Sequence, residues 1–176
     1  MQYNAAGLLK DSVGARRSFA FEYEEITTPD ENFREIAGVV RLLRIDNGIL
    51  AQVGVRGRTQ DQCSRCLGDA MVEIEAYLEE EYYPTNNFEG FTGGDEDNTG
   101  EFVDPALLID EDNILSVREP VRQAFLGVKP IAPLCRDDCK GICPTCSADL
   151  NEAPCECSPQ QEIPEWAKSL RSLEIN

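Results

Sequence analysis

The sequence predicts an α+β protein with an antiparallel, sheet-rich N-terminal part, one main helix and a C-terminal cysteine lobe that binds zinc. Three observations support this fold class. Long segments in the first half alternate apolar and polar residues, which is typical of strands with one buried face. A later segment repeats apolar residues at helical spacing. Six of the eight cysteines lie in the last quarter of the chain.

We expect these parts to form one composite domain. Residues 1–83 form the antiparallel sheet region and carry the first Cys-x-x-Cys pair, and residues 84–112 form an acidic loop. Residues 113–176 hold the helix, the cysteine-rich zinc lobe and a tail. A chain of 176 residues can bury a modest core of this kind.

The first strands come from the alternating segments. Residues 16–25 place three aromatic side chains on one face, and residues 36–45 form the first arm of a long hairpin. Asn47-Gly48 has the composition of a type I′ turn. The second arm has apolar residues on one face, namely Ile49, Ala51, Val53 and Val55.

A further strand is expected over residues 71–83. Its apolar face comprises Val72, Ile74, Ala76 and Leu78, and its opposite face carries Glu73, Glu75 and Glu79. Together these segments predict an antiparallel sheet with one buried and one charged face.

The main helix is expected to begin near Ser116. Ser116 and Glu119 have the spacing of a capping box, and Pro130 and Pro133 end the helix. The apolar residues at helical spacing are Val117, Val121, Ala124, Phe125 and Val128. Residues 164–173 predict a short second helix in the tail.

Charge is distributed unevenly along the chain. The net charge of −17 argues against a general nucleic-acid binder. Residues 66–117 contain fifteen acids and no Lys or Arg, and residues 84–100 read as a mobile acidic loop. Residues 41–66 hold five arginines against two acids, a balance of +3. The arginines are either a contact patch or ordinary solvent-facing residues, and the acids are expected to be a solvated face.

Composition also excludes several classes of activity. The chain contains no histidine, which removes every mechanism that needs a histidine base and every mixed Cys/His metal site. No apolar run is long enough to span a membrane, and the first residues do not resemble a secretory signal. We therefore expect a cytoplasmic protein without a membrane partner, and nothing in the sequence singles out catalytic residues.

The cysteine pairs allow three interpretations. Disulfides require an oxidising compartment, which the sequence does not suggest. A redox pair at Cys63 and Cys66 requires the start of a helix in a βαβ unit, whereas this pair lies between expected strands. Structural zinc needs four soft ligands, and Cys-x-x-Cys turns supply two each. Zinc is the interpretation that the spacing favours, with one or two ions per chain.

The sequence does not fix which of the eight cysteine sulfurs bind the same ion. The preferred site joins the two Cys-x-x-Cys pairs, Cys63, Cys66, Cys143 and Cys146. The other four cysteines, Cys135, Cys139, Cys155 and Cys157, form a second site or enter a mixed arrangement. In an extended strand, Cys155 and Cys157 lie too far apart for one ion, so the chain must bend there. Arg65, Arg136 and Lys140 are placed to offset the charge of zinc thiolates.

The order of these motifs resembles a known family. The features are Cys63-Ser-Arg-Cys66-Leu67, the run from Leu134 to Cys146 with its Gly and Pro, then Leu150-Asn151 and Cys155-Glu-Cys157. They resemble the YceD family, the large ribosomal RNA subunit accumulation proteins of bacteria and plastids. Two departures are Ser147, where relatives commonly have glycine, and Ile163-Pro164-Glu165, where many have Asp-Pro-Arg.

The resemblance implies a non-enzymatic ribosome-biogenesis factor that supports accumulation of large-subunit (23S) rRNA. Its partner would be rRNA or a pre-ribosomal particle, with a basic ribosomal protein as a further partner. The expected RNA contacts are Arg41, Arg44, Arg56 and Arg58, although Arg41 and Arg44 point to opposite faces of a regular strand. Two alternatives are an acidic module that binds a basic protein and a Cys-x-x-Cys thiol oxidoreductase.

Overall fold

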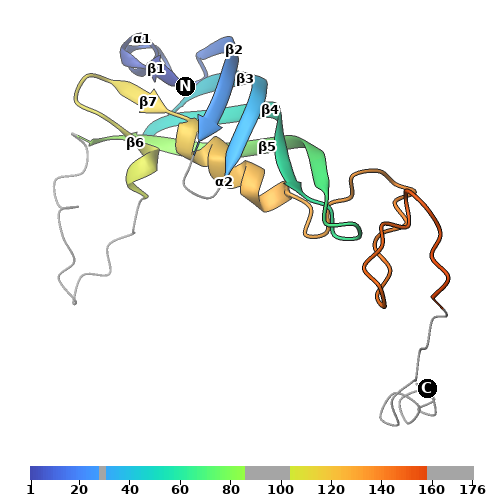
Figure 1. Ribbon diagram of the computed structural model, residues 1–176. Helices are drawn as coiled ribbons and strands as arrows, with labels where there is room; N and C mark the ends of the chain where they lie inside the picture. The colour runs from blue at the N-terminus through green and yellow to red at the C-terminus, as the bar shows by residue number, and fades with distance from the viewer. Residues whose placement is uncertain (28–30, 86–103, 158–176) are drawn as a thin grey trace, which may run out of the picture.

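The computed structural model describes residues 1–27, 31–85 and 104–157, which form the expected sheet-rich α+β fold (Figure 1). The elements are β1 (Gln2–Asn4), α1 (Ala6–Lys10), β2 (Arg16–Thr27), β3 (Asn32–Ile45), β4 (Gly48–Gln62), β5 (Asp69–Pro84), the 3-10 helix η2 (Pro105–Leu107), β6 (Leu108–Ile109), β7 (Ile114–Ser116) and α2 (Arg118–Val128). The main sheet has the order β2-β3-β4-β5-β6, antiparallel except for β5 and β6, and β1 pairs with β7. The curled main sheet carries α2 across one face.

The alternating patterns predict the buried face correctly. The apolar residues expected on the inner faces of β4 and β5 are all buried. Val40 of β3 lies opposite Val53 of β4, which lies opposite Leu78 of β5. Directly opposed residues share a face of an antiparallel sheet, so the core continues from strand to strand.

The β3–β4 hairpin is present, but its turn differs from the expected one. Ile45 pairs with Gly48, so the two loop residues are Asp46 and Asn47 rather than Asn47 and Gly48. Neither Asn47 nor Gly48 has a positive φ, so the turn is not type I′. Glycine is required at position 48 for a different reason, because an added Cβ would lie 2.0 Å from the carbonyl oxygen of Tyr82.

A β-bulge in β3 was not visible in the sequence. The register with β4 shifts between Arg34 and Ala37, and Glu35 has a φ of 51°. The shift lets Phe33 and Ile36, three residues apart, both face the core, where each is at most 1% exposed. Strict alternation would have sent one of these side chains to solvent.

Helix α2 packs on the inner face of the sheet. The ring of Phe125 lies 5.1 Å from the ring of Phe33, and it occupies the space that a Cβ on Gly57 would need. Val117, Val121 and Phe125 are buried as expected, whereas Val128 is exposed.

The expected capping box is wrong. Val117 is the N-cap residue, and it makes no side-chain capping hydrogen bond. The side-chain oxygen of Ser116 accepts a long hydrogen bond from the backbone N–H of Arg118, at 3.4 Å. Glu119 does not reach back because its carboxylate accepts from Arg122 at 2.6 and 2.8 Å.

Several short elements cover the end of the sheet and were not predicted. β1 and β7 bury Leu115, and the hydroxyl of Tyr82 donates to the carbonyl oxygen of Ser116 at 3.0 Å. Elements of two to five residues are too short to show a periodic pattern. Most of the expected acidic loop (residues 86–103) and the tail helix lie outside the described residues. Neither α1 nor α2 is long and apolar enough to cross a membrane.

An ion-pair cluster fixes the C-terminal end of α2 to the sheet. The ammonium group of Lys129 lies 2.5 Å from Glu31 and 3.0 Å from Asp61, which is two residues before Cys63. The three side chains are 19–28% exposed. The contact with Glu31 raises the pKa of Lys129, and the hydrogen bond from Lys129 lowers the pKa of Asp61.

We expect Lys129→Met to lower the free energy of unfolding by about 1–2 kcal/mol at neutral pH, because two half-buried carboxylates lose their partner. The depressed pKa of Asp61 contributes stability above its unfolded value of 3.8, and the raised pKa of Lys129 contributes below 10.5. The loss should therefore be largest between these limits and shrink as the solution is acidified. Urea titrations against pH measure it, with exposed Lys10→Met as the control; an equal loss in both variants would contradict the assignment.

Candidate metal centre

The eight cysteines form two four-sulfur groups. The first, called the junction cluster, contains Cys63, Cys66, Cys135 and Cys139. The second, called the lobe cluster, contains Cys143, Cys146, Cys155 and Cys157. Within each group, the four sulfur atoms lie within 4.8 Å of one another. The structure thus differs from the preferred pairing of the two Cys-x-x-Cys turns, because Cys63 and Cys66 meet Cys135 and Cys139 instead.

The path of the chain after α2 explains this pairing. The ion pairs of Lys129 hold the end of α2 beside the end of β4, and the backbone N–H of Ser64 donates to the carbonyl oxygen of Pro133 at 2.8 Å. The next residues therefore reach the β4–β5 turn first. The similarity of the two Cys-x-x-Cys turns favoured an ion shared between them. The direction of α2 across the sheet instead brings Cys135 and Cys139 to the first turn.

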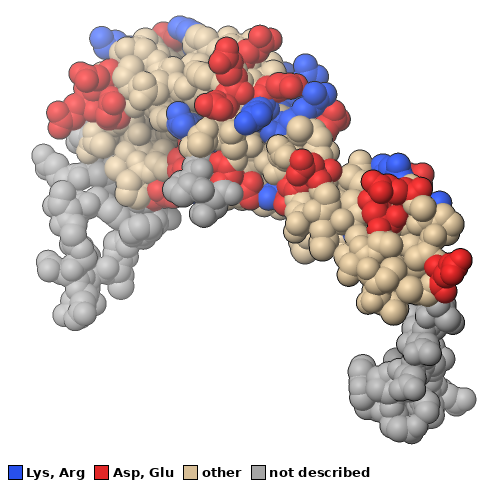
Figure 2. Space-filling model, viewed as in Figure 1, with Lys and Arg blue, Asp and Glu red and all other residues tan. Residues whose placement is uncertain are grey.

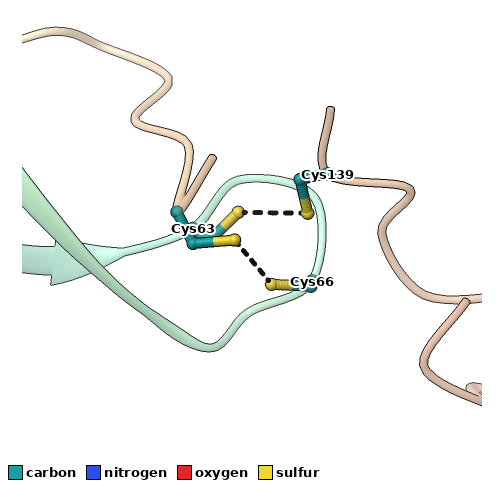
Figure 3. Close-up of side chains that lie close together, drawn as sticks. Cys63, Cys66 and Cys139 are labelled. Atoms are coloured by element: carbon teal, nitrogen blue, oxygen red, sulfur yellow. Dashed lines mark hydrogen bonds between the residues drawn. The ribbon is translucent and has the colours of Figure 1, made fainter. Parts of the chain in front are cut away.

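The junction cluster has the geometry of a tetrahedral thiolate site. Sγ of Cys63 lies 3.8 Å from Sγ of Cys139 (Figure 3). Sγ of Cys66 lies 3.7 Å from Sγ of Cys135. Four sulfurs at ~2.3 Å from a zinc ion are about 3.8 Å apart. Cys63 and Cys139 are at most 2% exposed, whereas Cys66 is half-buried and Cys135 is exposed, so this site joins the sheet to the C-terminal lobe with one side open to solvent.

The two Cys-x-x-Cys turns have the same backbone geometry. The residue after each second cysteine is left-handed, with φ of 62° at Leu67 and 58° at Ser147. Each donates its N–H to the carbonyl oxygen of the first cysteine, at 2.9 Å in both turns. Ser147 thus adopts a conformation that glycine favours.

The lobe cluster also resolves the difficulty at Cys155 and Cys157. Both residues lie in a segment without regular secondary structure, and both sulfurs reach the cluster. An extended strand would hold the two side chains too far apart, so the bend is what makes the Cys-x-Cys pair usable. The structure does not bring these residues together with Cys135 and Cys139, as the expected second site would require, and instead has the mixed arrangement that the sequence left open.

One sulfur in each cluster is prepared as a thiolate. The backbone N–H groups of Cys66 and Cys135 lower the pKa of Cys63 to about 6. Those of Cys146 and Thr145 lower the pKa of Cys143 to about 6.

Other members of each cluster shift the opposite way. Burial and the neighbouring sulfur of Cys139 raise the pKa of Cys135 to about 12, and the thiol of Cys146 together with burial raises the pKa of Cys157 to about 12. Four thiolates so close together repel unless a cation lies between them. All-sulfur tetrahedral donor sets suit zinc, so both clusters fit this ion.

The segment between the clusters docks on the first Cys-x-x-Cys turn. The carbonyl oxygen of Arg65 accepts a hydrogen bond from Ile142 at 3.1 Å, and the guanidinium of Arg65 donates to the carbonyl oxygen of Cys139 at 2.9 Å. Gly141 has a φ of 77°, and an added Cβ would lie 2.9 Å from the carbonyl oxygen of Arg65. Glycine is therefore required here by both conformation and space.

Asn151 connects the two clusters from the lobe side. Its side-chain amide donates to Sγ of Cys139 at 3.6 Å, and its side-chain oxygen accepts from Arg136 at 2.9 Å and from the backbone of Lys140 at 2.8 Å. In the sequence, Asn151 lies between Cys146 and Cys155 of the lobe cluster. Its hydrogen bond to Sγ of Cys139 therefore links the loop between these two cysteines to the junction cluster. The charged groups of Arg136 and Lys140 make no hydrogen bond to sulfur in the described residues.

The four arginines predicted to contact RNA do not form one patch. Arg44 points to the inner side of β3, where its guanidinium donates to the carbonyl oxygens of Ile45 and Gly48. Arg58 is bound by Glu35 at 2.9 Å and Glu73 at 3.0 Å. Arg41 and Arg56 are exposed on the outer face of the sheet, and no ion pair of the described residues involves them.

Part of the charge polarity of the sequence is offset where β4 pairs with β5. Strand β4 carries arginines, but its neighbour β5 carries the glutamates, so Arg56 lies opposite Glu75 and Arg58 opposite Glu73. Figure 2 shows Lys and Arg side chains interspersed with Asp and Glu on the face in view. Antiparallel pairing of the basic segment with the acidic one causes this cancellation.

An exposed aromatic residue lies between the two free arginines. Tyr77 of β5 is 63% exposed, and it lies opposite Gly54, which pairs in turn with Val39. A Cβ on Gly54 would contact nothing within 4 Å, so the space beside the Tyr77 ring is open. The hydroxyl of Tyr77 donates to Glu79 at 2.5 Å, which raises the pKa of the tyrosine. The sequence analysis missed this residue, although its polar-face position in β5 was readable from the alternation.

Comparison with known proteins provides a context for these features. A family model described as "Large ribosomal RNA subunit accumulation protein YceD" matches residues 51–174, which include all eight cysteines. Uncharacterized proteins of Mycobacterium tuberculosis and Mycobacterium bovis are each 29% identical over 135 residues, which cover 76% of this chain and 60% of the relative. One from Mycobacterium leprae is 29% identical over 132 residues, or 73% of this chain and 55% of the relative. The chain thus spans 55–60% of the length of these relatives. No solved structure matches.

We expect Gly141→Ala to lower the free energy of unfolding by about 1–3 kcal/mol, because alanine is strained at this φ and displaces the Arg65 carbonyl. Gly127→Ala in α2 is the matched control, since an added Cβ there contacts nothing within 4 Å. The control should be neutral or slightly stabilising. Urea unfolding of both variants measures the difference, and equal stability would show that the segment between the clusters does not dock as described.

Proposed function

The chain belongs to the YceD family, and from this membership we propose that it is a cytoplasmic, non-enzymatic, zinc-binding factor that supports accumulation of large-subunit rRNA. Family membership indicates a role connected with this RNA. The observation that carries the rest of the proposal is the pair of four-cysteine clusters. They use every cysteine in the chain and leave none for a thiol-disulfide active site.

In this proposal, the zinc ions have a structural role. One ion in the junction cluster holds the lobe against the β4–β5 turn, and one ion in the lobe cluster shapes a segment that has little regular secondary structure of its own. Such a segment gains its folding energy from the metal, since structural zinc contributes ~10–16 kcal/mol in small zinc-binding peptides. Closing the long loop between Cys66 and Cys135 costs only about 4 kcal/mol by comparison.

For the contact with rRNA, we propose the outer face of the sheet around Arg41, Tyr77 and Arg56. The two arginines supply positive charge for phosphates, and the exposed ring with open space beside it suits stacking of an unpaired base. Arg44 and Arg58 are left out because their guanidinium groups are already engaged by the protein. The glutamates of β5 limit this contact to a small site and oppose indiscriminate binding to RNA.

The acidic character of the chain supports a second candidate partner, a basic ribosomal protein. Exposed Glu73, Glu75, Glu79 and Glu81 lie along β5. In this case the factor would recognise a pre-ribosomal particle through protein rather than RNA. Cross-linking in cell extract distinguishes the two partners by whether bonds form mainly to rRNA or to one protein.

The zinc assignment predicts two zinc ions per chain in purified native protein. Replacing Cys63, Cys66, Cys135 and Cys139 together with alanine should remove one ion and leave the other, because the lobe cluster keeps its four sulfurs. Replacing Cys63, Cys66, Cys143 and Cys146 should remove both, because each cluster then keeps only two. Elemental analysis measures the ions, and the reverse pattern would restore the pairing of the two Cys-x-x-Cys turns. Metal-free native protein with titratable thiols would favour an oxidoreductase.

The RNA contact predicts that Arg41→Ala with Arg56→Ala weakens binding to large-subunit rRNA and reduces the salt dependence of affinity by a slope of about 1.5 in log–log units. Arg58→Ala with Arg122→Ala is the matched control, since it changes the net charge equally but removes arginines that are already paired. Filter binding at several salt concentrations measures both. An unchanged slope in the first variant, or the same loss in the control, would contradict the proposed face.

A further inference from the structure

Strand β2 forms a long free edge of the main sheet. It pairs with β3 on one side, and no strand of the described residues pairs with its other side (Figure 1). β2 has 12 residues, whereas the edge strand at the opposite end of the sheet, β6, has two. A free edge presents a row of unpaired N–H and C=O groups that can pair with another strand.

Several features that protect an edge strand are missing from β2. Residues 16–27 contain no proline and no lysine, and the bulge between β3 and β4 leaves β2 in regular register. Edge strands that avoid association are short or bulged, or carry proline or charged side chains, and β2 has only the charges, which are of both signs. β2 is therefore suited to pairing with another strand.

The side chains of β2 include aromatic residues that are only half covered. Phe19, Phe21 and Tyr23 face the inner side of the sheet, but Phe19 is 39% and Tyr23 40% exposed. Tyr3 packs against Phe19 from one side, with ring centroids 5.2 Å apart. The remaining apolar surface lies at the free edge, where an added strand would cover it.

The charges of β2 are arranged so that the strand complements itself. Arg16 and Arg17 lie at its N-terminal end, with Arg17 also paired to Asp11 at 2.6 Å, and Glu22, Glu24 and Glu25 lie toward its C-terminal end. When two copies of such a strand run antiparallel, the basic end of each meets the acidic end of the other. A uniformly basic partner would instead meet Arg16 and Arg17 with like charge.

We propose that β2 pairs antiparallel with β2 of a second copy of this chain, which extends the main sheet across a two-fold axis. The N–H and C=O groups of β2 point toward its free edge at every second residue. In an antiparallel pair of identical strands, the two-fold axis therefore lies between one residue and the same residue of the second copy. Centring the pair on Phe21 places Phe19 opposite Tyr23 of the second copy and Arg17 opposite its Glu25. Centring on Glu22 would place two glutamates face to face. The same surface patch serves both copies, as in most symmetric dimers.

Sedimentation velocity over a range of protein concentrations tests this dimer. Glu24→Lys with Glu25→Lys should raise the dissociation constant at least tenfold, because one lysine then lies opposite Arg17 of the second copy and the other lies diagonal to its Arg16. Arg16→Glu with Arg17→Glu should also raise the dissociation constant at least tenfold, because the introduced carboxylates then meet Glu24 and Glu25 of the second copy. A mixture of the two variants should form the dimer again, since every contact between them joins opposite charges.

Glu73→Lys with Glu75→Lys on the outer face of β5 is the matched control, because it changes the net charge by the same amount away from the edge. It should leave the dimer intact. The proposal is overturned if the wild-type chain is monomeric up to about 100 μM, if the dimer survives both edge variants, or if their mixture stays monomeric. Slow hydrogen exchange along all of β2 in a monomer would show that another part of the same chain covers the edge.

Discussion

The convergence of four sulfurs at the end of the β4–β5 hairpin is the contact on which the arrangement of the lobe depends. Two of these sulfurs come from the turn that follows β4, and two come from the chain that leaves α2. The lobe itself has little regular hydrogen bonding, with one isolated bridge between Ile142 and Asp149. Its position is therefore set by the junction cluster, by the backbone contacts of Arg65 and by the amide of Asn151.

The junction cluster also explains why the ion pairs of Lys129 matter. They hold the end of α2 beside the last residues of β4, and a few residues later the chain delivers Cys135 and Cys139 to the turn. Helix packing and the proposed metal site thus involve the same segment. The ion pairs of Lys129 contribute little energy themselves. They also restrict the segment after α2, which lowers the conformational entropy lost when Cys135 and Cys139 are brought to the turn.

Much of the sheet and the inner face of α2 could be predicted, because alternation and helical periodicity report burial directly. The patterns identified Val53, Leu78 and Phe125 as core residues. The bulge at Glu35 and the turn at Asp46-Asn47 could not be predicted, since both depend on how β3 meets its neighbours. Short elements such as β1 and β7 carry no periodic pattern at all.

The sequence predicted that the cysteines form groups suited to metal, but it did not predict which cysteine pairs come together. Spacing showed that the cysteines occur in pairs suited to metal, whereas which pairs meet depends on the direction of α2. The four predicted arginines are not gathered into one patch, because Arg44 lies on the inner side of β3 and Arg58 is paired with Glu35 and Glu73. The proposed function rests on this geometry, namely on two four-cysteine clusters that could hold metal ions and on the exposed side chain of Tyr77.

The most direct test of the cysteine grouping is NMR of the full chain loaded with cadmium-113 in place of zinc, which detects scalar coupling between each metal ion and the β-protons of its cysteine ligands. We expect one resonance coupled to Cys63, Cys66, Cys135 and Cys139, and a second coupled to Cys143, Cys146, Cys155 and Cys157. A single ion coupled to both Cys63 and Cys143 would contradict the account, because the lobe would then be joined to the sheet by a different set of sulfurs.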